Sequence, residues 1–218
     1  MQRIKDTVFD TIEPVVDFRN KTVLEIGCGI GSRSGQLASR CGFLTAIEPD
    51  EKSLQIARAL NIPNASFQNG LAEALEFDDH TFDIVFFTLS FHHVAKEKMM
   101  AAIDEAMRVL KKEGVVIFLE PTHDGTFFEA EIKFDACDGD ERKEKDAAYN
   151  AITTNEHIVV VKEIVDETAF HFESVDDFMQ SMQPKRNHEE IELFLTERDF
   201  VLTAYLRIII AAVTNSCQ

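Results

Sequence analysis

The feature that most constrains the fold lies between residues 20 and 121, where short apolar runs alternate with longer segments of helical periodicity. This alternation is typical of βαβ units, because parallel strands need a crossover, usually a helix, between them. Strands are predicted at residues 22–26, 43–48, 65–68, 82–88 and 114–120, and a helix at 96–110, where apolar residues recur every three or four positions. The sequence therefore predicts an α/β protein with a parallel sheet.

The segments outside this core carry weaker patterns. Residues 4–18 have helical spacing, and residues 122–156, with eight acids and four bases between 129 and 146, are interpreted as a helical insertion with a solvated outer face. Strand-like segments at 157–161 and 168–172 and helical segments at 175–182 and 188–198 precede a β run at 200–213, which could be one bent strand or a hairpin. Asp50 is predicted to cap the helix after the strand at 43–48.

A single domain is predicted over residues 1–218, because no linker or internal repeat interrupts the chain. We divide it into an N-terminal helix (1–19), a core (20–121), a lid-like helical insertion (122–156), and C-terminal strands and helices that complete the sheet (157–218).

The charge balance removes several classes of function. The chain has 22 Lys and Arg against 39 Asp and Glu, a net charge of −17, which would repel a phosphate backbone or an anionic membrane, so neither partner is expected. No run reaches the roughly 18 apolar residues of a membrane span. Acids at positions 6, 10 and 13 interrupt the place of a signal peptide, which predicts a cytoplasmic protein. The irregularly spaced cysteines indicate neither a zinc site nor a disulfide framework.

The sharpest chemical signal is the segment VLEIGCGIG at residues 23–31. An apolar strand runs into glycines at 27, 29 and 31 and then into a helix, so a nucleotide-like ligand can lie against the turn. A dinucleotide fingerprint requires G-x-G-x-x-G, whereas Ser32 occupies its sixth position here, which disfavours a nicotinamide cofactor. The carboxylate of Glu25 would repel a pyrophosphate and suits a ligand with an ammonium or sulfonium centre.

Further polar positions follow the other predicted strands. Glu48, 17 residues after Gly31, can accept hydrogen bonds from both hydroxyls of a ribose, although such a residue taken alone could equally be a surface or capping acid. Residues 69–72 and 88–93 follow the next two strands. Because the carboxyl ends of parallel strands meet at one edge of a sheet, these positions together predict a pocket.

Five segments of the chain resemble the ordered motifs of class I S-adenosylmethionine-dependent methyltransferases, namely VLEIGCGIG, AIEPD, QNGLAEALEF, FDIVFFTLSFHHV and VLKKEGVVIFLEP. They are most similar to the small-molecule subgroup typified by the ubiquinone/menaquinone-biosynthesis methyltransferases, and the resemblance covers about residues 20–121. It implies a Rossmann-like, doubly wound, seven-stranded and mostly parallel sheet with one antiparallel strand. It also implies S-adenosylmethionine as cofactor and S-adenosylhomocysteine as product.

The resemblance further implies how the cofactor is held. The glycine turn would cradle the methionine and ribose, with Glu25 beside the amino group through the turn, while Glu48 would hold the ribose. Many members carry an Asp where Leu71 stands, so here Asn69 or Glu73 must substitute in contacting the adenine amino group, or that contact is missing. The implied cofactor-binding residues are Glu25, Gly27, Cys28, Gly29, Gly31, Glu48, Pro49, Gly70, Leu71, Ala72 and Thr88.

Methyl transfer from a sulfonium is a direct displacement, so the protein mainly aligns the reactants and excludes water. A general base is needed only where the acceptor must lose a proton. His92 and His93 are the candidate catalytic bases; in the alternative, one packs structurally and the other hydrogen-bonds the backbone. A metal site formed by these two residues and His123 is less favoured, because no carboxylate-rich spacing accompanies them, and no metal is predicted.

Phe91, Phe127 and Tyr149 are candidate acceptor-binding residues beneath the lid, and ordinary core packing is an equally weighted alternative. The sequence thus predicts an S-adenosylmethionine-dependent methyltransferase that acts on a small molecule, as a monomer or homodimer. Three alternatives remain. They are a nicotinamide-dependent oxidoreductase, which the glycine spacing and Glu25 disfavour, a protein that binds S-adenosylmethionine or S-adenosylhomocysteine without catalysis, and a methyltransferase that acts on a protein or peptide.

Overall fold

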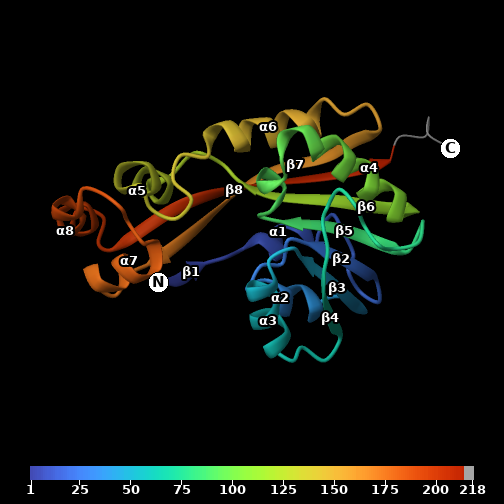
Figure 1. Cartoon of the computed structure of the whole chain (residues 1–218), viewed down its shortest axis with the longest axis horizontal. Coiled ribbons are helices and arrows are strands. Elements are labelled where there is room, and N and C mark those ends of the chain that lie inside the picture. The colour runs from blue at the N-terminus through green and yellow to red at the C-terminus, as the bar shows by residue number, and fades with distance from the viewer. Residues whose placement is uncertain (214–218) are drawn as a thin grey trace.

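An eight-stranded sheet runs through the centre of the molecule, in the order β1-β7-β8-β6-β5-β2-β3-β4 (Figure 1). The computed structural model describes residues 1–213. The strands are β1 (Gln2–Lys5), β2 (Thr22–Ile26), β3 (Phe43–Glu48), β4 (Ala65–Asn69), β5 (Phe82–Thr88), β6 (Leu110–Pro121), β7 (Ile158–His171) and β8 (Val201–Val213).

The sheet is mostly parallel. The five neighbouring strands β6, β5, β2, β3 and β4 run in one direction, β8 is antiparallel to both β6 and β7, and β1 is antiparallel to β7. The expected doubly wound α/β fold is confirmed, with eight strands rather than seven. The additional strand is β1, which joins the sheet by pairing Gln2 with His171 and Arg3 with Phe170.

Helices cover both faces of the sheet (Figure 1). Helices α1 to α3 pack on one face and α4 and α6 on the other, each face with its own buried apolar cluster. Helices α5, α7 and α8 form a third cluster at the far end of β7 and β8, which we call the distal lobe. The helices are α1 (Val8–Ile12), α2 (Ser34–Ala38), α3 (Glu51–Ala59), α4 (Met99–Val109), α5 (Thr126–Phe134), α6 (Arg142–Thr153), α7 (Val175–Met182) and α8 (Ile191–Thr196), with short 3-10 segments η1 (Phe91–His93), η2 (Lys96–Lys98) and η3 (His188–Glu190).

The core strands form where the sequence is almost continuously apolar, as expected for parallel strands that are covered on both faces. Leu24 of β2, Val85 of β5 and Phe118 of β6 are fully buried. Asp50 begins α3 as predicted, because its carboxylate accepts the N–H of Ser53 at 2.8 Å and so caps the helix. Burial of the strands and the cap on α3 thus hold in place the sheet edge at which these strands end.

The predicted helix over residues 4–18 is wrong. Residues 2–5 form β1 and only Val8–Ile12 are helical, with the helix ending before Pro14. Ile4, which the helical stripe would have buried, is 52% exposed. Pairing of β1 with the end of β7 satisfies the backbone of this segment, so a tertiary contact outweighs the local spacing.

The C-terminal half also departs from its predicted boundaries. The two strand-like segments at 157–161 and 168–172 belong to one strand, β7, because β8 pairs with it from Ile158 to His171. The run at 200–213 is a single strand, β8, and not a hairpin. The segment predicted to be a helical insertion, residues 122–156, contains two helices, α5 and α6.

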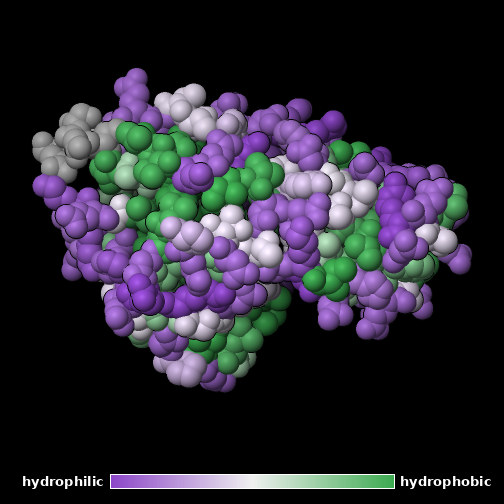
Figure 2. Space-filling model, turned by 180° about the vertical axis from the view of Figure 1, so that it is seen from behind, coloured by the Kyte–Doolittle hydropathy of each residue, from purple (hydrophilic) through white to green (hydrophobic). Residues whose placement is uncertain are grey.

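The rear face is largely hydrophilic, with apolar areas between the polar side chains (Figure 2). Among the large apolar side chains that remain exposed are Val159, Val161 and Val165 of β7. No helix within residues 1–213 combines the length and apolar character that crossing a bilayer requires.

Candidate functional site

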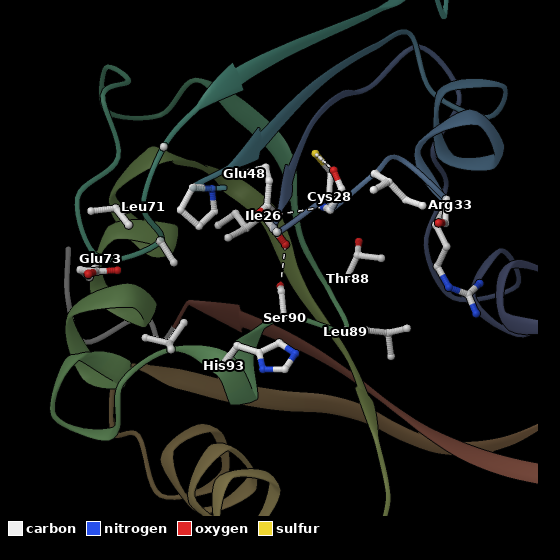
Figure 3. A pocket seen from close by; sticks show the side chains of 18 of the residues that line it. Ile26, Cys28, Arg33, Glu48, Leu71, Glu73, Thr88, Leu89, Ser90 and His93 are labelled. Atoms are coloured by element: carbon white, nitrogen blue, oxygen red, sulfur yellow. Dashed lines mark hydrogen bonds between the residues drawn. The ribbon is translucent and has the colours of Figure 1, made fainter. Parts of the chain in front are cut away.

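A cavity of about 620 Å³ lies at the carboxyl ends of the parallel strands, lined by residues that follow β2, β3, β4 and β5 (Figure 3). From β2 the chain builds the sheet outward through β3 and β4, and it then returns to place β5 on the other side of β2. This reversal is the switch point at which open α/β sheets bind ligands. The predicted pocket at this edge is therefore present.

The glycine turn forms one wall of the cavity. Gly27, Gly29 and Gly31 have φ angles of +73°, +54° and +81°, in the left-handed region that favours glycine. A Cβ atom on Gly27 would lie 2.2 Å from Cβ of Ser90, and one on Gly31 would lie 2.6 Å from Cδ1 of Leu60. A Cβ atom on Gly29 would meet nothing within 4 Å. Gly29 thus faces open space, while the other two glycines permit close packing behind the turn.

Glu48 ends β3 beside this turn (Figure 3). One carboxylate oxygen accepts the N–H of Gly29 at 2.9 Å and the other accepts the N–H of Asp50 at 3.0 Å. Each carboxylate oxygen has two lone-pair sites, so both can accept a further hydrogen bond from a ligand hydroxyl. The backbone therefore fixes Glu48 in a position from which it can hold two neighbouring hydroxyl groups.

Glu25 lies behind the turn and does not line the cavity. It is fully buried, and one of its oxygens accepts the hydroxyl of Ser34 at 2.6 Å. Burial raises the pKa of Glu25, against the opposing effects of the hydrogen bond from Ser34, the nearby hydroxyl of Thr88 and the charge of Arg33. Because burial disfavours the charged form, the expectation that Glu25 presents a free negative charge to the ligand is weakened.

Figure 3 shows Leu71 and Glu73 at the end of the cavity away from Arg33, and Pro49, Gly70 and Ala72 also line the cavity. Asn69 and Glu73 are the two predicted substitutes for an acid at position 71. Asn69 donates to two backbone carbonyl groups of the preceding loop and is absent from the cavity lining. Glu73 does line the cavity, and its carboxylate pairs with Lys98 at 2.7 Å. Of the two, Glu73 is the one that a ligand can reach.

Opposite this end, Arg33 and Arg3 add positive charge that the sequence analysis missed (Figure 3 labels Arg33). Each places its Nη1 atom 3.1 Å from the carboxylate of Asp6. Although burial opposes it, the charge of Arg33 lowers the pKa of Asp6. The Nε and Nη2 atoms of Arg33 are buried and have no partner within residues 1–213, so this guanidinium can still donate to an anionic group.

The two candidate bases differ in position. His93 lines the cavity and its side chain is 52% exposed, whereas His92 is 4% exposed and lies behind it. Nδ1 of His92 donates to Glu120 at the end of β6, and this carboxylate also accepts the backbone N–H groups of residues 90–92. Burial lowers the pKa of His92, but Glu120 and Glu141 raise it overall. Burial and the charge of His92 lower the pKa of His93.

The predicted aromatic acceptor residues do not line this cavity. Phe91 is fully buried among other phenylalanine rings of the core. Phe127 packs against Phe170 in the distal lobe, with ring centroids 4.9 Å apart. Tyr149 lies beneath the guanidinium of Arg207, 4.1 Å from its ring centroid, beside a separate small cavity. Packing, the alternative interpretation, accounts for the positions of Phe91 and Phe127.

The structure brings most of the predicted cofactor residues together. Those that line the cavity are Gly27, Cys28, Gly29, Glu48, Pro49, Gly70, Leu71, Ala72 and Thr88, joined by His93. Those that lie elsewhere are Glu25, Gly31, Phe91, His92, Phe127 and Tyr149. Burial and the neighbouring Glu25 and Glu48 raise the pKa of the Cys28 thiol to about 12, which keeps the thiol in its neutral form near pH 7.

Comparison with known proteins gives a consistent result. Residues 23–114 match the family model described as a methyltransferase domain. The chain is 32% identical over 115 residues to a ubiquinone biosynthesis O-methyltransferase from Neisseria meningitidis, an alignment that covers 50% of this chain and 48% of that protein. Several curated relatives are matched over about half of their length or less.

Solved structures share the fold at low sequence identity. A Bacillus halodurans C-125 protein superposes with a TM-score of 0.69 and 16% identity, covering 94% of this chain and 98% of that one. An S-adenosylmethionine-dependent methyltransferase from Aquifex aeolicus superposes with a TM-score of 0.58 and 15% identity, covering 91% and 88%. At such identities the likeness concerns the fold alone.

The turn geometry predicts that two neighbouring glycines differ in their tolerance of a side chain. Gly29→Ala should cost about 1–2 kcal/mol of stability, because only the left-handed φ is unfavourable. Gly27→Ala should cost that amount plus about 1–3 kcal/mol, because the new Cβ displaces Ser90. Urea denaturation of both variants measures the difference, and equal losses would contradict the close approach at Gly27.

Proposed function

We propose that this chain, whose residues 23–114 match a methyltransferase domain, is a class I S-adenosylmethionine-dependent methyltransferase that binds S-adenosylmethionine in the cavity beside the glycine turn and methylates a small molecule. The bound cofactor supplies an activated methyl group on its sulfonium. The residues of this chain bind and orient the cofactor, exclude water, and accept a proton where the acceptor has to lose one.

The observation that carries the proposal is the arrangement of Glu48 beside Gly29. Both carboxylate oxygens are fixed by backbone N–H groups and retain lone pairs, while the glycine leaves open space directly beside them. This arrangement suits a ribose with two adjacent hydroxyls. The end with the apolar side chain of Leu71 suits the adenine, and the end with Arg33 suits the carboxylate of the methionine part.

At the acceptor, His93 is the better candidate for the base, because it lines the cavity whereas His92 does not. The lowered pKa of His93 favours a neutral ring that can accept a proton near pH 7. We therefore assign His92 a positioning role behind it. A small-molecule acceptor is supported by the relative whose name refers to ubiquinone biosynthesis and by the net charge of −17, which disfavours nucleic acid.

The activity is tested by incubating the protein with S-adenosylmethionine and a cell extract divided by ultrafiltration into a small-molecule and a macromolecular fraction. Formation of S-adenosylhomocysteine should require the protein and the small-molecule fraction. Product formed only with the macromolecular fraction would replace the small-molecule acceptor by a protein or peptide. Tight cofactor binding with turnover in neither fraction would favour a binding protein without catalysis.

Glu48→Ala should weaken binding of S-adenosylhomocysteine by about 10- to 100-fold, because hydrogen bonds to a charged group contribute about 1.5–3 kcal/mol. Glu51→Ala is the matched control, since Glu51 is an exposed acid three residues away in α3. Isothermal titration calorimetry measures both affinities. Equal affinities for the two variants would place the ribose elsewhere.

Arg33→Met should weaken S-adenosylhomocysteine by about tenfold or more through loss of a charge-assisted contact to its carboxylate. The matched ligand is methylthioadenosine, which has the same nucleoside but neither the amino nor the carboxylate group. Its affinity should change by less than about twofold, because it has no charge for Arg33 to meet. A parallel loss for both ligands would mean that Arg33 supports the cavity wall and does not bind the carboxylate.

A further inference from the structure

Outside the cofactor contacts, two histidines and a carboxylate from distant parts of the chain converge. His92 and His93 of η1 meet Glu141, which directly precedes α6, and one ligand atom from each residue lies within 4.8 Å of the other two. We propose that these three side chains bind a divalent transition-metal cation of the zinc and cobalt type. The proposal concerns binding of the cation and does not rest on methyl transfer. A cation and a proton would compete for the lone pair of His93, so a bound cation would replace the base role proposed for that ring.

The hydrogen bonds around His92 leave the correct nitrogen free. Its Nδ1 atom donates to Glu120, so in the neutral ring the lone pair is on Nε2. That Nε2 atom lies 3.8 Å from the carboxylate of Glu141. A carboxylate that holds the second nitrogen of a histidine is the usual outer partner of a metal-binding imidazole, because it fixes the ring and its tautomer.

His93 presents its ring from the same side. Its Nδ1 atom lies 3.5 Å from Glu141, and its ring centroid lies 4.0 Å from that of His92. Two rings this close repel each other when both are protonated. A cation between the two rings uses both lone pairs without that repulsion.

The carboxylate of Glu141 lacks close partners. Its side chain is 13% exposed, and the nitrogen atoms of His93, Lys145 and His92 lie 3.5, 3.7 and 3.8 Å from it. These separations are at or beyond the limit of direct hydrogen bonds. Three ligand atoms at about 2.0–2.2 Å from one cation stand roughly 3–3.5 Å apart, so the present cluster needs to close by about 1 Å.

The charge around the cluster also favours a cation. Glu120, Glu131, Asp138 and Glu141 all act on the two histidines or on one another, and Lys145 is the one basic residue among the groups that shift them. The carboxylates of Glu120, Asp138 and Glu141 against the one lysine leave an excess of negative charge that a divalent cation would offset.

The donor set selects the type of metal. Two imidazole nitrogens and one carboxylate suit zinc, cobalt, iron or manganese better than magnesium or calcium, which prefer oxygen ligands alone. His123 does not belong to the cluster; its Nδ1 atom lies 3.8 Å from Asp146 instead. Because His93 also lines the large cavity, a bound cation would lie beside its wall.

The test is a titration of the chelator-treated, untagged protein with Co²⁺, followed by the visible absorption of the bound ion and by competition with Zn²⁺. The protein should bind one Co²⁺ per chain. Glu141→Gln and His93→Ala should each weaken binding by at least about tenfold. His123→Ala, the matched histidine control, should change affinity by less than about twofold. His92 is left intact because it is buried and holds the structure around Glu120.

A third variant separates a metal site from a purely structural cluster. Lys145→Met removes the basic side chain 3.7 Å from Glu141 and should tighten Co²⁺ binding, whereas it should not do so if the ion binds elsewhere. Failure of the intact protein to bind one Co²⁺ per chain would overturn the proposal. So would unchanged affinity in both Glu141→Gln and His93→Ala. Failure of the intact protein to bind S-adenosylhomocysteine would contradict the proposed function and would leave the proposal of a metal site unaffected.

Discussion

The structure depends on a close approach between the ends of two neighbouring strands, β2 and β5. Gly27 and Ser90 meet there so closely that no Cβ atom fits between them, and the hydroxyl of Ser90 donates to the carbonyl of Ile26 at 2.6 Å. At this contact the chain leaves β2 and enters the glycine turn. The cavity forms beside the turn because the two strands diverge into different connections at that point.

A second buried group extends this organisation to the histidines. Glu120 is 7% exposed and gathers the N–H groups of residues 90–92 together with the ring of His92. Since several donors converge on one carboxylate, the segment after β5 is held firmly against the end of β6. His93 is thereby directed to the cavity wall, while His92 is directed toward the insertion and Glu141.

The sequence alone predicts those parts of the site whose positions depend only on neighbouring residues. The turn at 27–31 and the acid at Glu48 follow directly from strand ends, and three of the core strands have the predicted boundaries. Glu120 could have been recognised in the same way, because it too ends a predicted strand, and Arg33 stands two residues beyond the turn. The position of each residue relative to a strand end or to the turn can be read from the neighbouring sequence alone.

Other features depend on contacts between segments that no local pattern encodes. β1 forms because its backbone pairs with β7, more than 160 residues later, which brings Arg3 to the cavity. Glu141 reaches the two histidines only because α6 packs over η1, so a carboxylate absent from the local sequence joins them in space. Phe91 is an aromatic residue of the kind that can line a pocket, but its side chain is buried in the core. Residue type alone does not distinguish a pocket residue from a core residue.

The central claim is that the cavity beside Gly29 and Glu48 holds S-adenosylmethionine. The most direct measurement is a calorimetric titration of the purified protein with S-adenosylhomocysteine, with NAD as the control ligand. The account predicts one site per chain with micromolar affinity for S-adenosylhomocysteine and no heat of binding for NAD. Absence of binding by S-adenosylhomocysteine, or preferential binding of NAD, would contradict it.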